Sequence, residues 1–88
     1  MTRFVQSKDV AWNFLGDKII AFNLSGEKQF HDLNETAAVV FQALAAPVSK
    51  SELVAALVAE FEVTDETAAS DVEAIVLDMQ TKRLIVEA

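Results

Sequence analysis

The sequence predicts an α+β fold in one small domain, with a three-stranded antiparallel sheet followed by three helices. Over the first third of the chain, apolar residues alternate with other residues, which is the period of a half-buried strand. From residue 34 onward they recur at helical spacing in three segments. The length of 88 residues is that of a single domain. Strands that precede a run of helices are typical of α+β proteins, with the helices on one side of the sheet.

The first two strands are expected over residues 10–15 and 18–24. Val10, Trp12 and Phe14 alternate with other residues in the first. Gly16-Asp17 supplies the turn between the two strands.

The third strand is expected over residues 28–33, after a turn at Ser25-Gly26, where glycine accepts a positive φ without steric cost. This strand is short and polar, and both are features of edge strands. Residues 1–9 carry little pattern and are expected to form a loose lead-in, so that the domain covers residues 10–88.

Three helices with recognisable start signals follow. Asn34 can cap the first helix, and Pro47 marks the break after it. Ser49 and Glu52 have the spacing of a capping box, and Thr64 can cap the third helix. The apolar stripes of the three helices are Ala37, Val40, Phe41 and Leu44; Leu53, Val54, Leu57, Val58 and Phe61; and Ala68, Val72, Ile75, Val76 and Met79. A short extended segment is expected over residues 84–86.

Composition excludes several classes of protein. Cysteine is absent, which rules out disulfides, thiolate metal sites and cysteine nucleophiles. The N-terminal MTRFVQSKDV lacks the apolar run of a signal peptide, and no stretch approaches the ~20 apolar residues of a membrane span. We therefore expect a cytoplasmic protein without a membrane partner. The formal net charge of −7 opposes phosphate binding, although it equally fits a plain solvated surface.

No catalytic or cofactor motif is present. His31 is the only histidine, and no nucleophile-elbow sequence accompanies it. Because His31 and Asp32 are adjacent on a predicted strand, they point to opposite faces and would not share a metal. The carboxylates have no EF-hand spacing, and neither a Walker loop nor a G-x-G-x-x-G motif is present. We expect no enzyme activity, no metal and no cofactor.

A sheet with three helices also fits a winged helix, which raises the possibility of DNA binding. The candidate recognition helix is the third. Its exposed side carries Glu66, Asp71, Glu73 and Asp78, with Lys82 and Arg83 only at its end. Phosphate would be repelled along most of that helix, so no nucleic-acid partner is expected.

The third strand has a second possible use. An exposed edge offers unpaired amides and carbonyls, to which an extended peptide can add a strand. An apolar groove against the third helix would then contact alternate peptide side chains. The alternative is that polar residues merely protect this edge, and physical reasoning alone does not decide between the two.

Three blocks of sequence resemble the PqqD-like family of peptide chaperones, which includes the recognition elements for ribosomally made precursor peptides. The first is Leu33-Asn34-Glu35-Thr36-Ala37-Ala38, similar to the family's junction between third strand and first helix. The second runs from Ser51-Glu52-Leu53-Val54 to Phe61-Glu62-Val63, and the third is Asp71-Val72, Met79 and Leu84-Ile85. The resemblance covers about residues 10–86. One departure is Arg83, where the family often has a glycine in left-handed geometry. Either the third helix ends differently here, or Arg83 or Lys82 bears some strain.

The resemblance implies a small winged-helix-like domain that binds a precursor's leader peptide along the third strand and presents it to a modifying enzyme. In the founding pathway that enzyme is a radical-SAM protein of pyrroloquinoline quinone synthesis, but the pathway of this chain is left open. The peptide-binding residues carried over are Lys28, Gln29, Phe30, His31, Asp32 and Leu33 on the strand, and Asp71, Ile75, Asp78, Met79 and Lys82 on the helix. Ile75 and Met79 could equally belong to the core.

Two further questions stay open from the sequence. The alternative function is a winged-helix regulator or protein-interaction module without a peptide-chaperone role. The expected oligomeric state is a monomer or a weak homodimer, since an exposed strand edge could also pair two copies.

Overall fold

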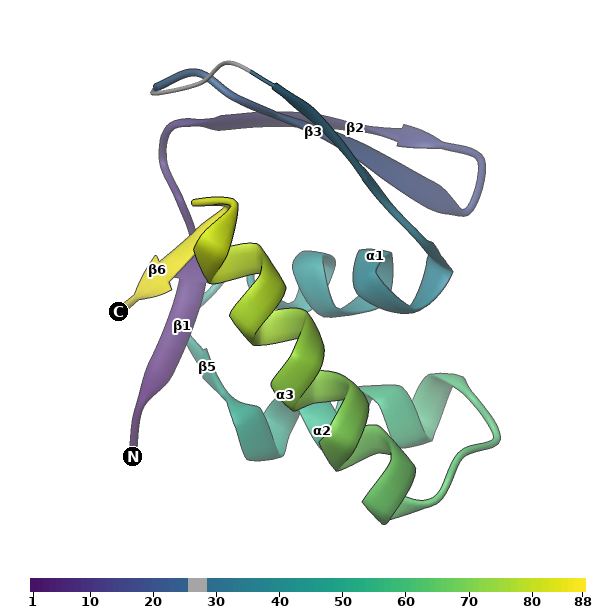
Figure 1. Cartoon of the computed structure of the whole chain (residues 1–88). Coiled ribbons are helices and arrows are strands. Elements are labelled where there is room, and N and C mark those ends of the chain that lie inside the picture. The colour runs from purple at the N-terminus through teal and green to yellow at the C-terminus, as the bar shows by residue number, and fades with distance from the viewer. Residues whose placement is uncertain (26–28) are drawn as a thin grey trace.

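The computed structural model describes residues 1–25 and 29–88, and it confirms the predicted α+β class. Two small antiparallel sheets combine with three helices, and the three helices lie on one side of the sheet β2–β3–β4 (Figure 1). No helix in these two ranges is long and apolar enough to cross a membrane. In chain order the elements are β1 (Arg3–Gln6), β2 (Val10–Leu15), β3 (Lys18–Asn23), β4 (Phe30–Leu33), α1 (Glu35–Ala43), β5 (Val48–Ser49), α2 (Lys50–Glu60), α3 (Asp65–Thr81) and β6 (Ile85–Glu87).

The predicted meander is the sheet β2–β3–β4, in which β3 is central. Gly16 begins its first turn with φ +69°, which a two-residue hairpin loop with glycine in first position requires. The side chains of β3 alternate between the two faces. Ile19, Ala21 and Asn23 are buried on the inner face, toward the helices, while Ile20 and Phe22 are half-buried on the outer face.

The edge strand β4 is shorter than predicted. It covers Phe30–Leu33, and Gln29 lies outside it. Lys28, the expected first residue of the strand, and Gly26 of the expected turn both lie outside the described residues. The predicted three-stranded antiparallel meander is therefore confirmed, with four residues in its edge strand.

The expected loose lead-in over residues 1–9 is wrong for its middle part. Arg3–Gln6 forms β1, the central strand of a second sheet with the order β5–β1–β6 (Figure 1). Phe4 is only 4% exposed and belongs to the hydrophobic core. Local pattern did not reveal β1 because its partners are Val48–Ser49 and Ile85–Glu87, far away in the sequence. The strand β6 is close to the expected extended segment.

The predicted helix starts are confirmed. The Asn34 side chain accepts a hydrogen bond from the Ala37 amide at 2.9 Å, and Ser49 and Glu52 form a complete capping box. The Thr64 side chain accepts from the Thr67 amide at 3.2 Å. Most residues of the apolar stripes are buried in the core. Ala37, Val54, Phe61 and Ile75 are half-buried and pack against it, while Val58 is 36% exposed.

The end of α3 explains the departure at Arg83. Arg83 adopts the left-handed conformation with φ +59°. Its amide donates to the Gln80 carbonyl at 3.0 Å, and the Leu84 amide donates to the Met79 carbonyl at 2.9 Å. These two bonds constitute a Schellman motif, which glycine usually completes. An arginine therefore occupies a position that costs an L-residue about 1–2 kcal/mol.

We expect Arg83→Gly to stabilise the domain by about 1 kcal/mol, since it removes the left-handed penalty while the larger flexibility of unfolded glycine offsets part of the gain. For a domain of this size, the melting temperature should rise by roughly 4–8 °C in a thermal scan followed by far-UV circular dichroism. Lys82→Gly is the matched control, because Lys82 has an ordinary φ of −82° and should gain nothing. A melting temperature of Arg83→Gly at or below that of the wild type would contradict this assignment.

Candidate functional site

The strand β4 has one open edge in the described part of the chain, because it pairs there with β3 alone. Its register places His31 opposite Ala21 and Leu33 opposite Ile19, so both face the helices. Leu33 is buried and His31 is half-buried. Phe30 and Asp32 are exposed on the outer face. The edge itself is a row of backbone groups that a further strand could use.

Helix α3 has one flank on each side of its buried stripe. Asp71, Ile75, Asp78 and Lys82 are spaced by four, three and four residues and share one flank, here called the Ile75 flank. Glu73, Leu77 and Gln80 share the other, here called the Gln80 flank. Between them lie the buried residues Ala68, Val72, Val76 and Met79.

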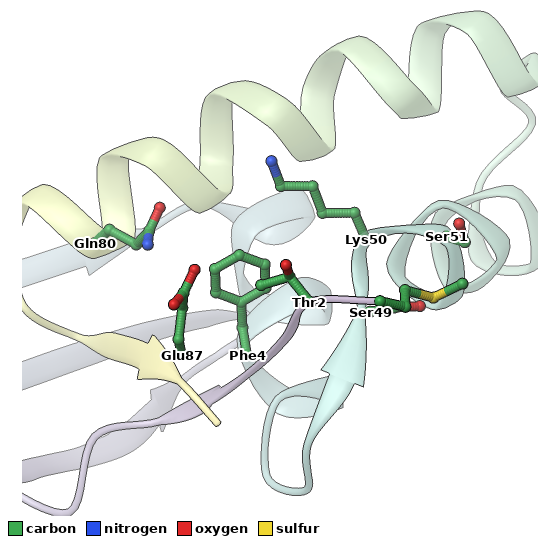
Figure 2. Close-up of a pocket in the computed structure, with 8 residues that line it drawn as sticks. Thr2, Phe4, Ser49, Lys50, Ser51, Gln80 and Glu87 are labelled. Carbon is green, nitrogen blue, oxygen red and sulfur yellow. The ribbon is translucent and has the colours of Figure 1, made fainter.

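The Gln80 flank faces the start of α2. The Lys50 Nζ atom lies 3.0 Å from a carboxylate oxygen of Glu73. Gln80 lines an open pocket of about 390 Å³ with Phe4, Lys50 and Glu87, and with the smaller Thr2, Ser49 and Ser51 (Figure 2). The Lys50 ammonium group that lines this pocket is therefore already paired with Glu73. The Ile75 flank lies on the other side of the helix.

A buried polar side chain joins the sheet to α3. Asn23, at the end of β3, is 5% exposed. Its Nδ2 atom donates to the carbonyls of Lys82 at 3.4 Å and Arg83 at 3.1 Å, and its Oδ1 atom accepts from the amide and hydroxyl of Ser25. Asn23 thereby fixes the C-terminal end of the Ile75 flank against the sheet. Sequence reasoning missed it, although an asparagine in alternation with Ile19 and Ala21 on an inner face is an available signal.

The residues carried over for peptide binding divide into accessible and buried groups. Met79 is 0% exposed and Leu33 is 2% exposed, so the side chains of both belong to the core. For Met79 this settles the question that the sequence left open, because it continues the stripe of Val72 and Val76. In this conformation neither side chain is accessible to a peptide, whereas the backbone of Leu33 still lies on the edge strand β4.

The other carried-over residues remain accessible wherever they are described. Gln29, Phe30, Asp32 and Asp78 are exposed, and His31, Asp71, Ile75 and Lys82 are half-buried, while Lys28 lies outside the described residues. Ile75 packs against the core by part of its side chain. On the helix, the Lys82 Nζ atom lies 2.8 Å from an Asp78 carboxylate oxygen. The Ile75 flank is therefore an apolar residue bordered by one ion pair and one further acid.

Nothing in the described ranges gathers groups for metal binding. Among residues 1–25 and 29–88, no cluster of three histidine, aspartate or glutamate side chains could hold a metal ion. The chemistry that this region offers is the backbone edge of β4, together with the side chains of the Ile75 flank.

Comparison with known proteins adds a family to this geometry. The sequence model of the family described as coenzyme PQQ synthesis protein D (PqqD) matches residues 20–85. The chain belongs to the PqqD family. The PqqD match begins inside β3 and contains β4 and all three helices, so β1 and β2 precede it. The resemblance inferred from the sequence is thereby confirmed.

A solved structure shows the same fold as this PqqD-family chain. It is described as TbiB1 in complex with the TbiA(β) leader peptide, and the two align with a TM-score of 0.83. The alignment covers 92% of this chain and 93% of the other, at 20% sequence identity. At that identity the likeness establishes the fold. No curated protein matches the chain.

Proposed function

We propose that this PqqD-family chain is a non-enzymatic adaptor that binds the leader segment of a ribosomally made precursor peptide. The leader adds a strand to the open edge of β4 and lies toward the Ile75 flank of α3. The observation that carries the proposal is the open four-residue edge of β4 in a domain whose α3 is fixed to the same sheet through Asn23. The similar fold of TbiB1, described as bound to a leader peptide, supports it.

Backbone groups of β4 would supply the part of the affinity that does not depend on the sequence of the leader. A peptide that adds to a sheet edge gains main-chain hydrogen bonds, while pockets for alternate side chains give specificity. In the proposal the strand contacts come from residues 29–33, with Lys28 preceding them. Leu33 contributes through its backbone alone, because its side chain is buried.

The inward-facing leader side chains would meet His31 and the Ile75 flank. Ile75 offers its exposed part to an apolar leader residue. Lys82 and Asp78 already form an ion pair, so a charged leader residue gains only by exchanging one partner. Asp71 has no ion-pair partner among the described residues and is the better acceptor for a basic leader residue.

The adaptor would act without chemistry of its own. By ordering a flexible leader and docking on a modifying enzyme, it would raise the effective concentration of the core peptide at the active site of that enzyme. A radical-SAM protein is one class of partner that the family suggests. The lack of cysteine fits the reducing cytoplasm, where we place the adaptor.

The direct test is a binding titration with synthetic leader peptides from precursor genes beside the gene for this chain. Fluorescence anisotropy of the labelled leader should show saturable binding, and a scrambled peptide of the same composition should not bind. A duplex DNA oligonucleotide is a second probe, and the charge of −7 predicts no binding. If no leader binds to folded protein, the adaptor role is wrong. Binding of the duplex instead would support the winged-helix regulator.

A further inference from the structure

No helix or strand of the described residues covers the outer face of the sheet β2–β3–β4. All three helices lie on the inner side (Figure 1). The outer face nevertheless carries apolar side chains. Phe30 is 70% exposed, and its ring lies against Phe22 with a centroid distance of 4.6 Å. Ile20, two residues from Phe22 on β3, lies on the same face.

Phe30 and Asp32 occupy the outer positions of the open strand. The register pairs Phe30 with Phe22 and Asp32 with Ile20, which places all four side chains on one face. Asp32 is exposed, and no Lys, Arg or His of the described residues forms an ion pair with it. On the edge of β4, an exposed aromatic ring therefore stands two residues from an exposed carboxylate without a described ionic partner.

A strand that adds to β4 must place half of its side chains on this outer face. Residues directly opposite each other on neighbouring strands have Cβ atoms about 4.5–5.5 Å apart, and they point to the same side of the sheet. One peptide residue would therefore lie beside Phe30, and another, two positions away, would lie beside Asp32. Neither can reach the inner groove.

We propose that the leader is read on both faces of the sheet, and that Phe30 and Asp32 read the outer one. Phe30 selects an apolar or aromatic leader residue, because such a residue covers the exposed ring and extends the aromatic pair with Phe22. Asp32 selects a lysine or arginine two positions away through an opposite-charge cross-strand pair. The ligand class is then an extended segment that has an apolar residue and a basic residue two positions apart, both on the outer side of the sheet. This inference rests on the proposed strand addition.

The charge half of the proposal is tested by exchanging charges between protein and peptide. The probe is a synthetic leader that binds the wild-type chain, together with versions in which each Lys or Arg is replaced in turn by Glu. Asp32→Lys should weaken the native leader about three- to tenfold, since an attractive cross-strand pair becomes a repulsive one. One Glu-substituted leader should regain affinity for Asp32→Lys. Asp17→Lys is the matched control, because Asp17 lies in the hairpin turn outside β4 and carries the same change of charge.

The aromatic half is tested by Phe30→Ser, which should weaken binding about fivefold. Leu15→Ser is its control, because Leu15 is 62% exposed at the end of β2, a strand that β3 separates from β4. Thermal unfolding of each variant checks that the fold is kept.

The outcomes separate this inference from the proposed function. If the wild-type chain binds no leader, both are overturned. If it binds and both Asp32→Lys and Phe30→Ser bind as tightly as their controls, strand addition stands and outer-face reading is overturned. Rescue of Asp32→Lys by one Glu-substituted leader, with loss of affinity in Phe30→Ser, supports the reading on the outer face.

Discussion

One of the variants Phe30→Pro and His31→Pro should lose leader binding by at least tenfold while the domain stays folded. Backbone amides alternate in direction along a strand, so one of these two residues donates toward β3 and the other toward the open edge of β4. Proline removes the amide. An edge strand tolerates proline at a position where the replaced residue's amide faced the open edge. The proline variant at that position should keep its stability and lose a hydrogen bond to the leader.

The other proline variant should show the opposite pattern. Proline at the residue that donates to β3 removes a bond of the ladder and should lower the melting temperature. Phe30→Ala and His31→Ala are the matched controls, since they keep the amides and remove only the side chains. The measurements are thermal unfolding and leader titration for all four variants. If the proline variant that remains stable binds the leader as well as its alanine control, strand addition to β4 is excluded.

The second large effect is expected at Asn23. Asn23→Ala should destabilise the domain by about 1–3 kcal/mol, because it leaves the carbonyls of Lys82 and Arg83 without this donor in a buried place. For a domain of this size, each kcal/mol corresponds to roughly 4–8 °C in melting temperature. Leader affinity should fall as well, since the end of α3 is no longer fixed to β3.

Asn13→Ala is the matched control for Asn23→Ala. Asn13 is exposed on the outer face of β2, and its Oδ1 atom accepts a hydrogen bond from the amide of the next residue, Phe14. Loss of the Asn13 side chain should change the free energy of unfolding by no more than about 0.5 kcal/mol. Equal melting temperatures for the two alanine variants would show that Asn23 does not join the sheet to α3.

The features that the sequence predicted well are those with local causes. Asn34, Ser49 and Thr64 start helices through hydrogen bonds that span three residues, so their side chains and spacing carry the signal. The alternation in β2 and β3 likewise lies within single strands. Gly16 defines the hairpin between them by its own positive φ.

The features that were missed depend on contacts between distant residues. The strand β1 exists because it fits between β5 and β6, and its four residues show no period long enough to recognise. Asn23 gains its role from carbonyls at residues 82 and 83. Periodicity gives the buried stripe of α3 but does not fix its width, so Met79 and Ile75 could not be separated until their burial was known.

The resemblance to PqqD-like proteins supplied what periodicity could not. It directed attention to the position before Leu84-Ile85, where the structure has a left-handed Arg83 in a Schellman motif. It also singled out the third strand as the peptide site, a choice that physical reasoning left balanced. The binding residues on that strand and on α3 remain predictions.

The central claim is that a leader peptide occupies the open edge of β4 beside the Ile75 flank of α3. The most direct measurement is an NMR titration of ¹⁵N-labelled protein with a synthetic leader peptide from a precursor gene beside the gene for this chain. We predict amide shifts concentrated at residues 29–33 and 71–82, with cross-strand contacts between leader amides and β4. Shifts centred instead on the pocket of Lys50 and Gln80, or no shifts with any such leader in a folded sample, would contradict the account.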